Sequence, residues 1–202
     1  VVIYPYGDDL ARLDITDPAN PSWSIATDAP RPHVDYNLWM PQLIAASSEF
    51  IFLPMAEKGV SVFRIEPGYP FHGFLYDPSD PWRMHFSAEV FEDDALICGG
   101  QAPKTVQIYD IADLPPGDPG DDIISSSAFI GSIEVSPTLS TALHPRVWAT
   151  QTTRLSGTTF VPSTGPAVER IVAAVGQRGG VQFLDLSAAI ENHVIANPTT
   201  RV

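Results

Sequence analysis

A hairpin pattern that recurs four times constrains the fold of this chain more than any other feature of its sequence. Each copy has a short apolar segment, a turn with glycine or charged residues, and a second segment that ends in Asp or Arg followed by Ile or Leu. Apolar segments joined by a short polar turn are typical of β-hairpins. The copies are VVIYPYGDDLARLDI (1–15), FIFLPMAEKGVSVFRI (50–65), ALICGGQAPKTVQIYDI (95–111) and RIVAAVGQRGGVQFLDL (170–186).

The spacing of these copies predicts the architecture. The intervals between the first three are about 45–50 residues, the period of β-propeller blades. We therefore expect an all-β fold, a β-propeller of four-stranded antiparallel blades, with about three and a half to four repeats in one domain or propeller fragment over 1–202. A ring must close, so we expect further residues or another chain to complete it. A self-contained four-bladed ring is the alternative.

A second repeated element precedes three of the hairpins and carries a histidine at its entrance. The segments are 31–49, 81–94 and 143–157, and their histidines are His33, His85 and His144. In a propeller this element is the innermost strand, which lines the central channel. Three imidazoles that converge there would suit a catalytic Fe, Cu or Zn ion with an open coordination position. The alternative is that each histidine bonds a neighbouring backbone and is structural.

Turn-forming segments rich in Asp and Pro follow the hairpins. Proline cannot donate to a strand ladder, so TDPANP (16–21), EPGYP (66–70) and DLPPGDPGDD (113–122) predict strand ends and blade-to-blade connections. His72 falls in such a connection. Two insertions, at 113–127 and 158–170, predict either ligand-binding loops or tolerated surface loops. A calcium site at 118–122 is a weak further hypothesis.

Composition excludes several classes of partner. The net charge is −13, with 24 acidic and 11 basic residues, which argues against binding to nucleic acid or to an anionic membrane. The sequence has no long apolar segment and no signal peptide in the given residues, so we expect a soluble protein. The single cysteine, Cys98, allows no internal disulfide, and we expect it to be packed in the core.

Two smaller predictions follow from local composition. A helix is expected over 187–196 with Ser187 as its cap. The acidic turns 92–94 and 121–122 are expected to carry solvated charge. Trp82 and Trp148 each lie near a repeat histidine, which favours packing between blades.

Several segments resemble known propeller families. ALICGG followed by VQIYDI resembles the Kelch repeat, and RMHFSAEVFEDDALICGG (83–100) is similar to blades of galactose-oxidase-like propellers. LARLDITDPANP (10–21) resembles the LVIVD type of repeat. The resemblance implies a propeller. It does not extend to copper-radical chemistry, because His85 and Phe86 stand where the galactose-oxidase family has Tyr and His before the serine.

Two functions remain from the sequence. The first is a binding or interaction module that takes a protein or small-molecule ligand on a propeller face through its rim loops. The alternative is a propeller metalloenzyme, an oxidoreductase or lyase, that uses His33, His85 and His144 on a small or sugar-like substrate.

Overall fold

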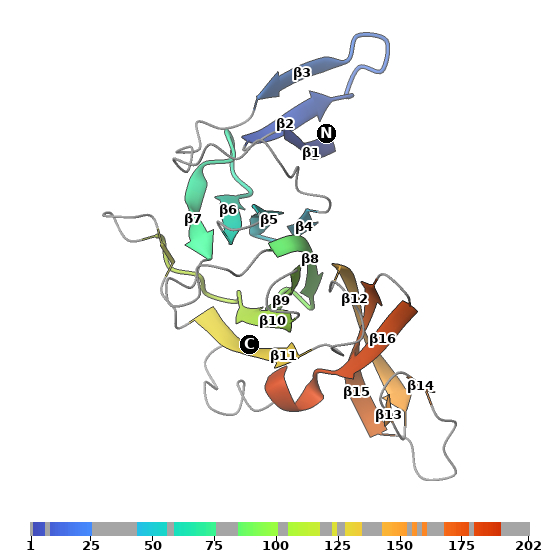
Figure 1. Ribbon diagram of the computed structural model, residues 1–202. Helices are drawn as coiled ribbons and strands as arrows, with labels where there is room; N and C mark the ends of the chain where they lie inside the picture. Colours follow the sequence, from blue (N-terminus) through green and yellow to red (C-terminus); the bar gives the residue numbers. More distant parts are fainter. Residues whose placement is uncertain are drawn as a thin grey trace.

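The chain is an all-β protein in the computed structural model shown in Figure 1. The structure describes residues 2–6, 9–25, 44–55, 59–75, 85–100, 105–117, 123–124, 128–134, 143–152, 155–156, 159–160, 168–177 and 180–190.

Four antiparallel sheets follow one another along the chain, and a short hairpin interrupts the fourth. The first sheet holds β1 (Val2–Tyr6), β2 (Asp9–Asp14) and β3 (Ser22–Ile25). The second holds β4 (Ala45–Ala46), β5 (Phe50–Pro54), β6 (Val60–Arg64) and β7 (Phe71–Leu75). The third holds β8 (His85–Phe91), β9 (Ala95–Gly100), β10 (Thr105–Asp110) and β11 (Phe129–Glu134). The fourth holds β12 (Leu143–Thr152), β15 (Val168–Gln177) and β16 (Gly180–Asp185), and β13 (Leu155–Ser156) pairs with β14 (Thr159–Phe160).

All four predicted hairpins are confirmed. They are β1–β2, β5–β6, β9–β10 and β15–β16, and each is paired antiparallel in continuous register. The Gly99–Gly100 pair ends β9, as the repeat predicts. The predicted entrance strands are also present at 81–94, as β8, and at 143–157, as β12. Most of the segment 31–49 lies outside the described residues, and β4 is its described end.

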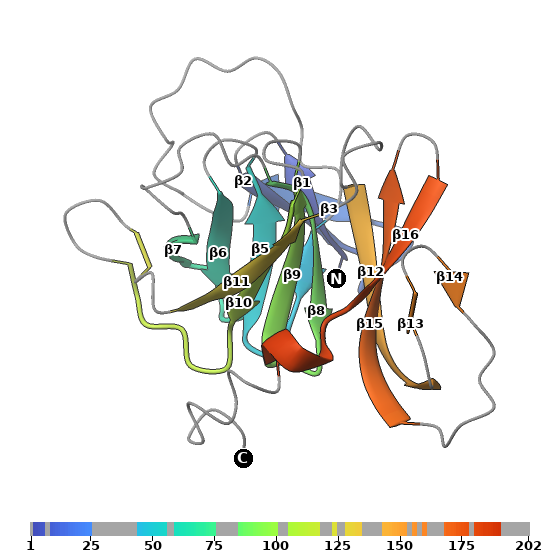
Figure 2. The same ribbon diagram turned by 60° about the horizontal axis from the view of Figure 1, so that its bottom comes forward.

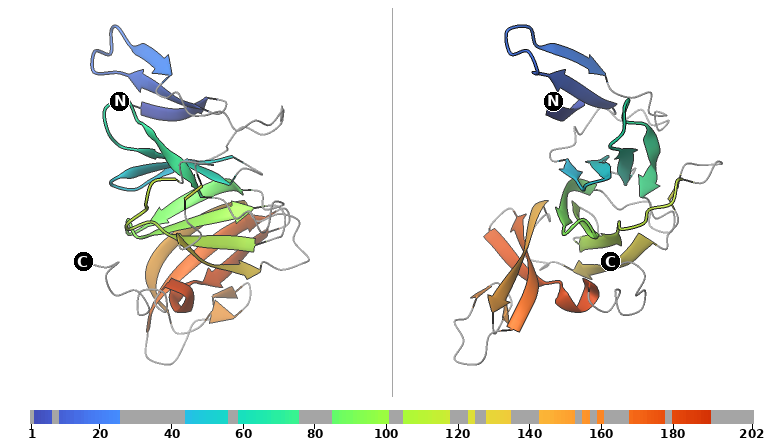
Figure 3. Two further views of the ribbon diagram at one scale, coloured as in Figure 1. Left: turned by 90° about the vertical axis from the view of Figure 1, so that its left-hand side faces the viewer. Right: turned by 180° about the vertical axis from the view of Figure 1, so that it is seen from behind.

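The sheets are arranged in chain order around an arc (Figures 1 and 3). The first strands β4, β8 and β12 lie on the inner side of this arc, and β8 contacts both of the others. The strands β7 and β11 lie at the outer edges of their sheets. Figure 2 shows the strands of the second and third sheets standing side by side along the arc.

The third sheet is packed on both faces, because its strands alternate apolar side chains between two clusters. One face contributes Leu96, Cys98 and Tyr109 to a cluster with Phe50, Phe52, Val60 and Val62 of the second sheet. The other contributes Ala95, Ile97, Val106 and Ile108 to a cluster with Ala173, Val175 and Leu184 of the fourth sheet. A strand buried on both faces reads as continuous apolar sequence, which explains the segment ALIC in β9.

The prediction that the Asp- and Pro-rich segments join one repeat to the next is wrong. Residues 15–21, 65–70 and 111–128 each join the second strand of a repeat hairpin to the outermost strand of the same sheet. His72 accordingly lies in β7 and not in a connection. A turn marks where a strand ends, but β3 (SWSI) has only four residues, and β7 (FHGFL) and β11 (FIGSIE) do not alternate, so the sequence did not reveal these outer strands.

The insertion at 113–127 is partly a strap on the second sheet. The Gly117 N–H donates to the His72 carbonyl at 2.9 Å, and the Ile124 N–H donates to the Phe74 carbonyl at 2.8 Å. Ile123 forms a parallel bridge to Phe74, and Leu114 and Ile124 are buried in the cluster between the second and third sheets. The strap therefore covers backbone groups of β7 that an exposed edge strand would leave open.

The predicted helix is helical over residues 187–190, and its remainder lies outside the described residues. Ser187 does not act as its cap. The Ser187 hydroxyl accepts the Ile171 N–H at 2.9 Å, and the Asp185 carboxylate accepts the Ser187 N–H at 3.0 Å. No helix within the described residues is long and apolar enough to cross a membrane.

Candidate functional site

His85 lies in a buried triangle of polar side chains with Gln107 and Tyr109. The His85 Nε2 contacts Gln107 Oε1 and lies 3.0 Å from the Tyr109 hydroxyl, which donates to the same Gln107 oxygen at 2.7 Å. All three residues are buried. An amide oxygen only accepts hydrogen bonds, so Nε2 must carry the proton of His85. In this arrangement Nε2 is a donor and cannot serve as a metal ligand.

The register of the third sheet explains how a first-strand residue reaches the third strand. His85 is the first residue of β8 and pairs with Gly100, while Gln107 pairs with Cys98 on the same face of β9. Glycine has no side chain, so the histidine ring has room to cross β9 toward β10. Gly100, the second glycine of the pair that ends β9, thus leaves the space that the His85 ring needs to reach Gln107 and Tyr109.

The structure brings together β8 and β12, the strands that carry the predicted metal ligands His85 and His144. Of these two side chains it describes only that of His85. His144 is the second residue of β12, which contacts β8. His33 lies outside the described residues, as does the side chain of His144. Among the described residues, no group of three or more His, Cys, Asp or Glu side chains is placed to hold a metal ion. The acidic segment 118–122 also lies outside the described residues.

His72 fastens the strap to the second sheet. Its Nε2 lies 3.0 Å from the Leu114 carbonyl, to which it must donate, and its ring centroid is 5.0 Å from that of Phe50. The sequence placed His72 in a blade-to-blade connection, and the structure assigns it a hydrogen bond to backbone.

Cys98 is fully buried in the cluster between the second and third sheets, as predicted. Burial raises the pKa of its thiol, because the thiolate would lose its hydration. Reactive cysteines need exposure and a lowered pKa, and Cys98 has neither.

We expect Cys98 to resist iodoacetamide in the native protein and to react readily in denaturant. The reason is that alkylation requires the thiolate and an opening of the core. Mass spectrometry of the alkylated protein, with and without denaturant, measures both rates. Equal labelling in the two conditions would contradict the burial of Cys98.

The aspartates that end the repeats have a common structural role. The carboxylates of Asp14, Asp110 and Asp185 accept the N–H two residues ahead, at 3.0, 3.1 and 3.0 Å. This is an Asx-turn, which starts the turn after the strand. The second copy has Arg64 instead, and its Nε is 2.9 Å from Glu66 Oε1. The sequence showed that Asp recurs at this position, but it did not show that the carboxylate forms an Asx-turn there.

The pKa values of two carboxylates, one at the end of β2 and one in the turn after it, are lowered. For Asp14 the main cause is hydrogen bonding from Thr16, and for Asp17 it is the side chain of Asn20, 2.8 Å away, together with the Ala19 N–H. A lowered pKa in the folded state stabilises the turn above the unfolded value of 3.8, and this stabilisation is lost as the pH falls through the folded values.

We expect NMR titration of Asp14 and Asp17 to give midpoints below 3.8. In Asn20→Ala the Asp17 midpoint should rise toward that value, because the largest lowering cause is removed, while the Asp14 midpoint stays unchanged. A rise at both residues, or at neither, would contradict these hydrogen bonds.

One end of the sheets gathers acidic residues. The first-to-second turns of the second and third sheets lie at this end, where the Ser48 N–H donates to Asp93 Oδ1 at 3.0 Å. The connections from each repeat hairpin to the outermost strand, the strap included, leave from the same end, because successive strands are antiparallel. We call the exposed and half-buried carboxylates of these turns and connections, and of the strand ends beside them, the acidic rim: Asp14, Asp17, Glu49, Glu66, Glu92, Asp93, Asp94, Asp110, Asp113 and Asp185.

The acidic turn 92–94 carries more than solvated charge. Glu92 and Asp93 are exposed and adopt positive φ values of 50° and 60°, and Asp93 links the third sheet to the second. The opposite end carries the hairpin turns within each repeat, and His85 begins β8 there. His85 and the acidic rim therefore lie at opposite ends of the third sheet, and Gln107 and Tyr109 of the triangle lie between them.

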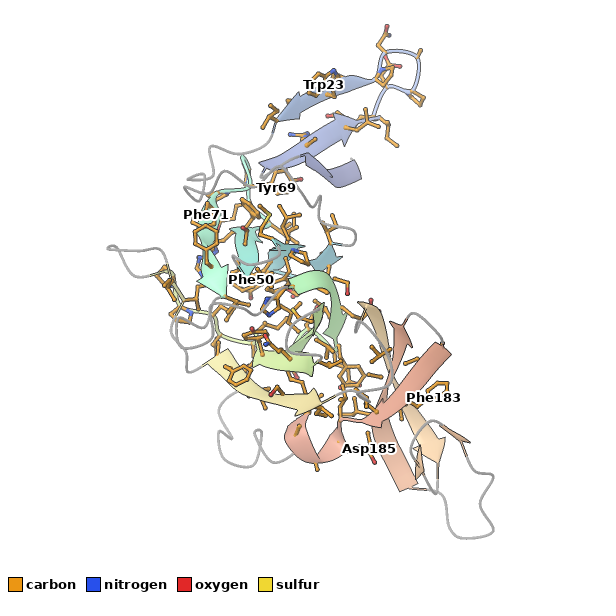
Figure 4. All side chains as sticks on the ribbon, viewed as in Figure 1. Trp23, Phe50, Tyr69, Phe71, Phe183 and Asp185 are labelled. Atoms are coloured by element: carbon orange, nitrogen blue, oxygen red, sulfur yellow. The ribbon has the colours of Figure 1, made fainter. Side chains whose placement is uncertain are left out.

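Two sets of residues were not predicted. Gln107 and Tyr109 are polar partners of His85, and only their alternation with Val106 and Ile108 could have signalled a shared face. Trp23, Phe71 and Phe129 occupy one position of the repeat, opposite Leu13, Phe63 and Tyr109. Trp39, Trp82 and the side chain of Trp148 lie outside the described residues. Figure 4 shows Trp23 and Phe71 on the outer strands of their sheets.

Comparison with known proteins gives no match. No protein-family model matches the chain. No curated protein matches its sequence, and no solved structure matches its fold.

Proposed function

We propose that the chain forms a β-propeller, or a large part of one, and serves as a binding module that recognises its ligand through the acidic rim. The repeat period and the four hairpins support the propeller, together with the chain-ordered arc of sheets whose first strands lie inside. In such a fold the hairpins hold the scaffold and the longer connections carry recognition.

The observation that carries the proposal is the concentration of described carboxylates at one end of the sheets. The acidic rim gathers the carboxylates of several repeats at one end, and the connections there include the two insertions. Two cations at this end whose side chains the structure describes, Arg12 and Arg64, each pair with a carboxylate of the rim, Asp14 and Glu66. The negative charge that remains favours a protein ligand with a basic surface and disfavours nucleic acid.

The metalloenzyme alternative has less support. It needs His85 as a ligand, and the Nε2 of His85 is a donor to Gln107, so only Nδ1 could coordinate a metal in this arrangement. Coordination through Nε2 would require the triangle to open and leave the buried amide of Gln107 and the hydroxyl of Tyr109 without that contact.

Affinity capture with rim variants tests the binding function. In Glu92→Lys/Asp113→Lys we expect the ligand recovered by the wild-type chain to be lost, because both residues are exposed in the rim. The control is Glu134→Lys, at the end of β11 on the opposite end of the same sheet, and it should retain the ligand. A ligand retained by the rim variant would contradict the proposal.

Elemental analysis of the purified chain tests the alternative. We expect no stoichiometric Fe, Cu or Zn that depends on His85. A metal present at one per chain and absent from His85→Ala would favour the enzyme, whatever the rim variants do. The two experiments are independent, because His85 and the rim lie at opposite ends.

A further inference from the structure

The connection that contains the strap is longer than the link between its two strands requires. The corresponding connections of the first and second sheets have seven and six residues, 15–21 and 65–70, whereas 111–128 in the third sheet has eighteen. All three join the second strand of a repeat hairpin to the outermost strand of its own sheet. A short turn therefore suffices for the link, and the extra length brings the strap onto the second sheet.

The described parts of the strap lie on β7 as an added strand. The Gly117 N–H donates to the His72 carbonyl at 2.9 Å. The Ile124 N–H donates to the Phe74 carbonyl at 2.8 Å. Ile123 bridges Phe74 in the parallel direction, and β7 is an outer edge of its sheet. Addition of an extended segment to a sheet edge through backbone hydrogen bonds is a recurring mode of peptide recognition.

Aliphatic side chains of the strap give this contact its sequence preference. Ile124 is buried in the cluster between the second and third sheets, together with Leu75 and Ile111. Leu114 is buried in the same cluster, and its carbonyl lies 3.0 Å from His72 Nε2. When a strand is added to an edge, the backbone supplies affinity and the side chains that enter pockets select the sequence. The edge of β7 therefore fits an extended segment with an aliphatic residue at the position of Ile124.

We propose that the outer edge of β7 is a docking site for an extended aliphatic segment of a partner protein, and that the strap is the built-in competitor for this site. When the strap opens, the partner segment adds to β7 in parallel and places an aliphatic side chain where Ile124 lies. The strap competes at the high local concentration of a tethered segment, so a partner binds only if it fits better or the strap is weakened. The contacts of this site include no carboxylate of the acidic rim, so its failure would leave the rim proposal standing.

Peptide binding to a strap variant tests the proposal. The probe is a fluorescent peptide with the strap sequence DLPPGDPGDDIISSS (113–127). We expect it to bind Ile124→Ser about tenfold more tightly than the wild-type chain, or better, because the strap of the variant has lost its buried anchor and competes less. The same peptide with serine in place of Ile124 should bind neither chain.

The matched control is Ile190→Ser. Ile190 is also a buried isoleucine, but it belongs to the cluster of the third and fourth sheets, so this variant should bind the probe no better than the wild-type chain. Far-UV circular dichroism checks that both variants are folded. A probe that binds all three chains equally, or none of them, would overturn the proposal.

Hydrogen exchange of the wild-type chain tests the opening without any substitution. The Gly117 and Ile124 amides should exchange through a local opening, about tenfold faster or more than the amides of the β9–β10 ladder, because few hydrogen bonds hold the strap. Strap amides that exchange only together with the ladder would overturn the proposal. A wild-type dimer in sedimentation velocity that is lost in Ile124→Ser would also overturn it, because the occupant would then be the strap of a second copy.

Discussion

Phe52→Ala is expected to lower the free energy of unfolding by about 3–5 kcal/mol, the range found when a buried phenylalanine is truncated. Phe52 is fully buried on β5, and its cluster joins the second sheet to the third. The ring centroid of Phe50 is 6.2 Å away, and both backbones are held in β-ladders, so the cavity has little freedom to collapse. Denaturant unfolding followed by circular dichroism measures the change.

The matched control for Phe52→Ala is Ile15→Ala. Ile15 is also apolar, but it is 43% exposed in the turn after β2, so its truncation should change stability by about 0.5 kcal/mol or less. Equal losses in the two variants would show that the interface between the second and third sheets is not the core described here.

The second large effect is expected at the histidine triangle. Gln107→Leu keeps the approximate volume of the side chain but removes the oxygen that accepts from both His85 and Tyr109. Each buried donor that loses its acceptor costs about 1–3 kcal/mol, so the two together rival the loss at Phe52. The same denaturant measurement applies.

A double-mutant cycle shows whether the loss at Gln107 comes from the triangle. In Gln107→Leu/Tyr109→Phe the hydroxyl is removed together with its acceptor, so the double variant should be more stable than the sum of its single changes predicts. Additive losses would mean that Gln107 and Tyr109 act separately. The cycle also tests whether His85 has a structural role, as its buried contacts with Gln107 and Tyr109 indicate.

The strands that could be predicted from the sequence are those whose apolar runs, alternation and turn residues all lie within one short segment. The hairpin β9–β10 shows an apolar run, Gly-Gly, a polar spacer and alternation, and each of these has a local cause. The burial of Cys98 followed from the same run. The outer strand β3 could not be predicted, because SWSI is short and exposed and has only its register with Leu13 to identify it.

The polar site was harder to predict than the fold, because its partners are distant in sequence. His85 was selected as a repeated residue, but its contacts are 22 and 24 residues away, on β10. The number of residues between them depends on the length of the β9–β10 turn and says nothing about which side chains share a face. The role of His72 depended in the same way on the strap, which reaches it from 42 residues further along the chain.

The strap has a consequence for synthesis on the ribosome. The contacts His72–Leu114 and Ser48–Asp93 span 42 and 45 residues, which is about one repeat. The second sheet therefore cannot cover its outer edge until the third has emerged, which takes a few seconds at about 5–20 residues per second. During that interval β7 is open to neighbouring nascent chains. Slowing translation just after the second repeat should thus lengthen the period in which mispairing competes with the native order of assembly.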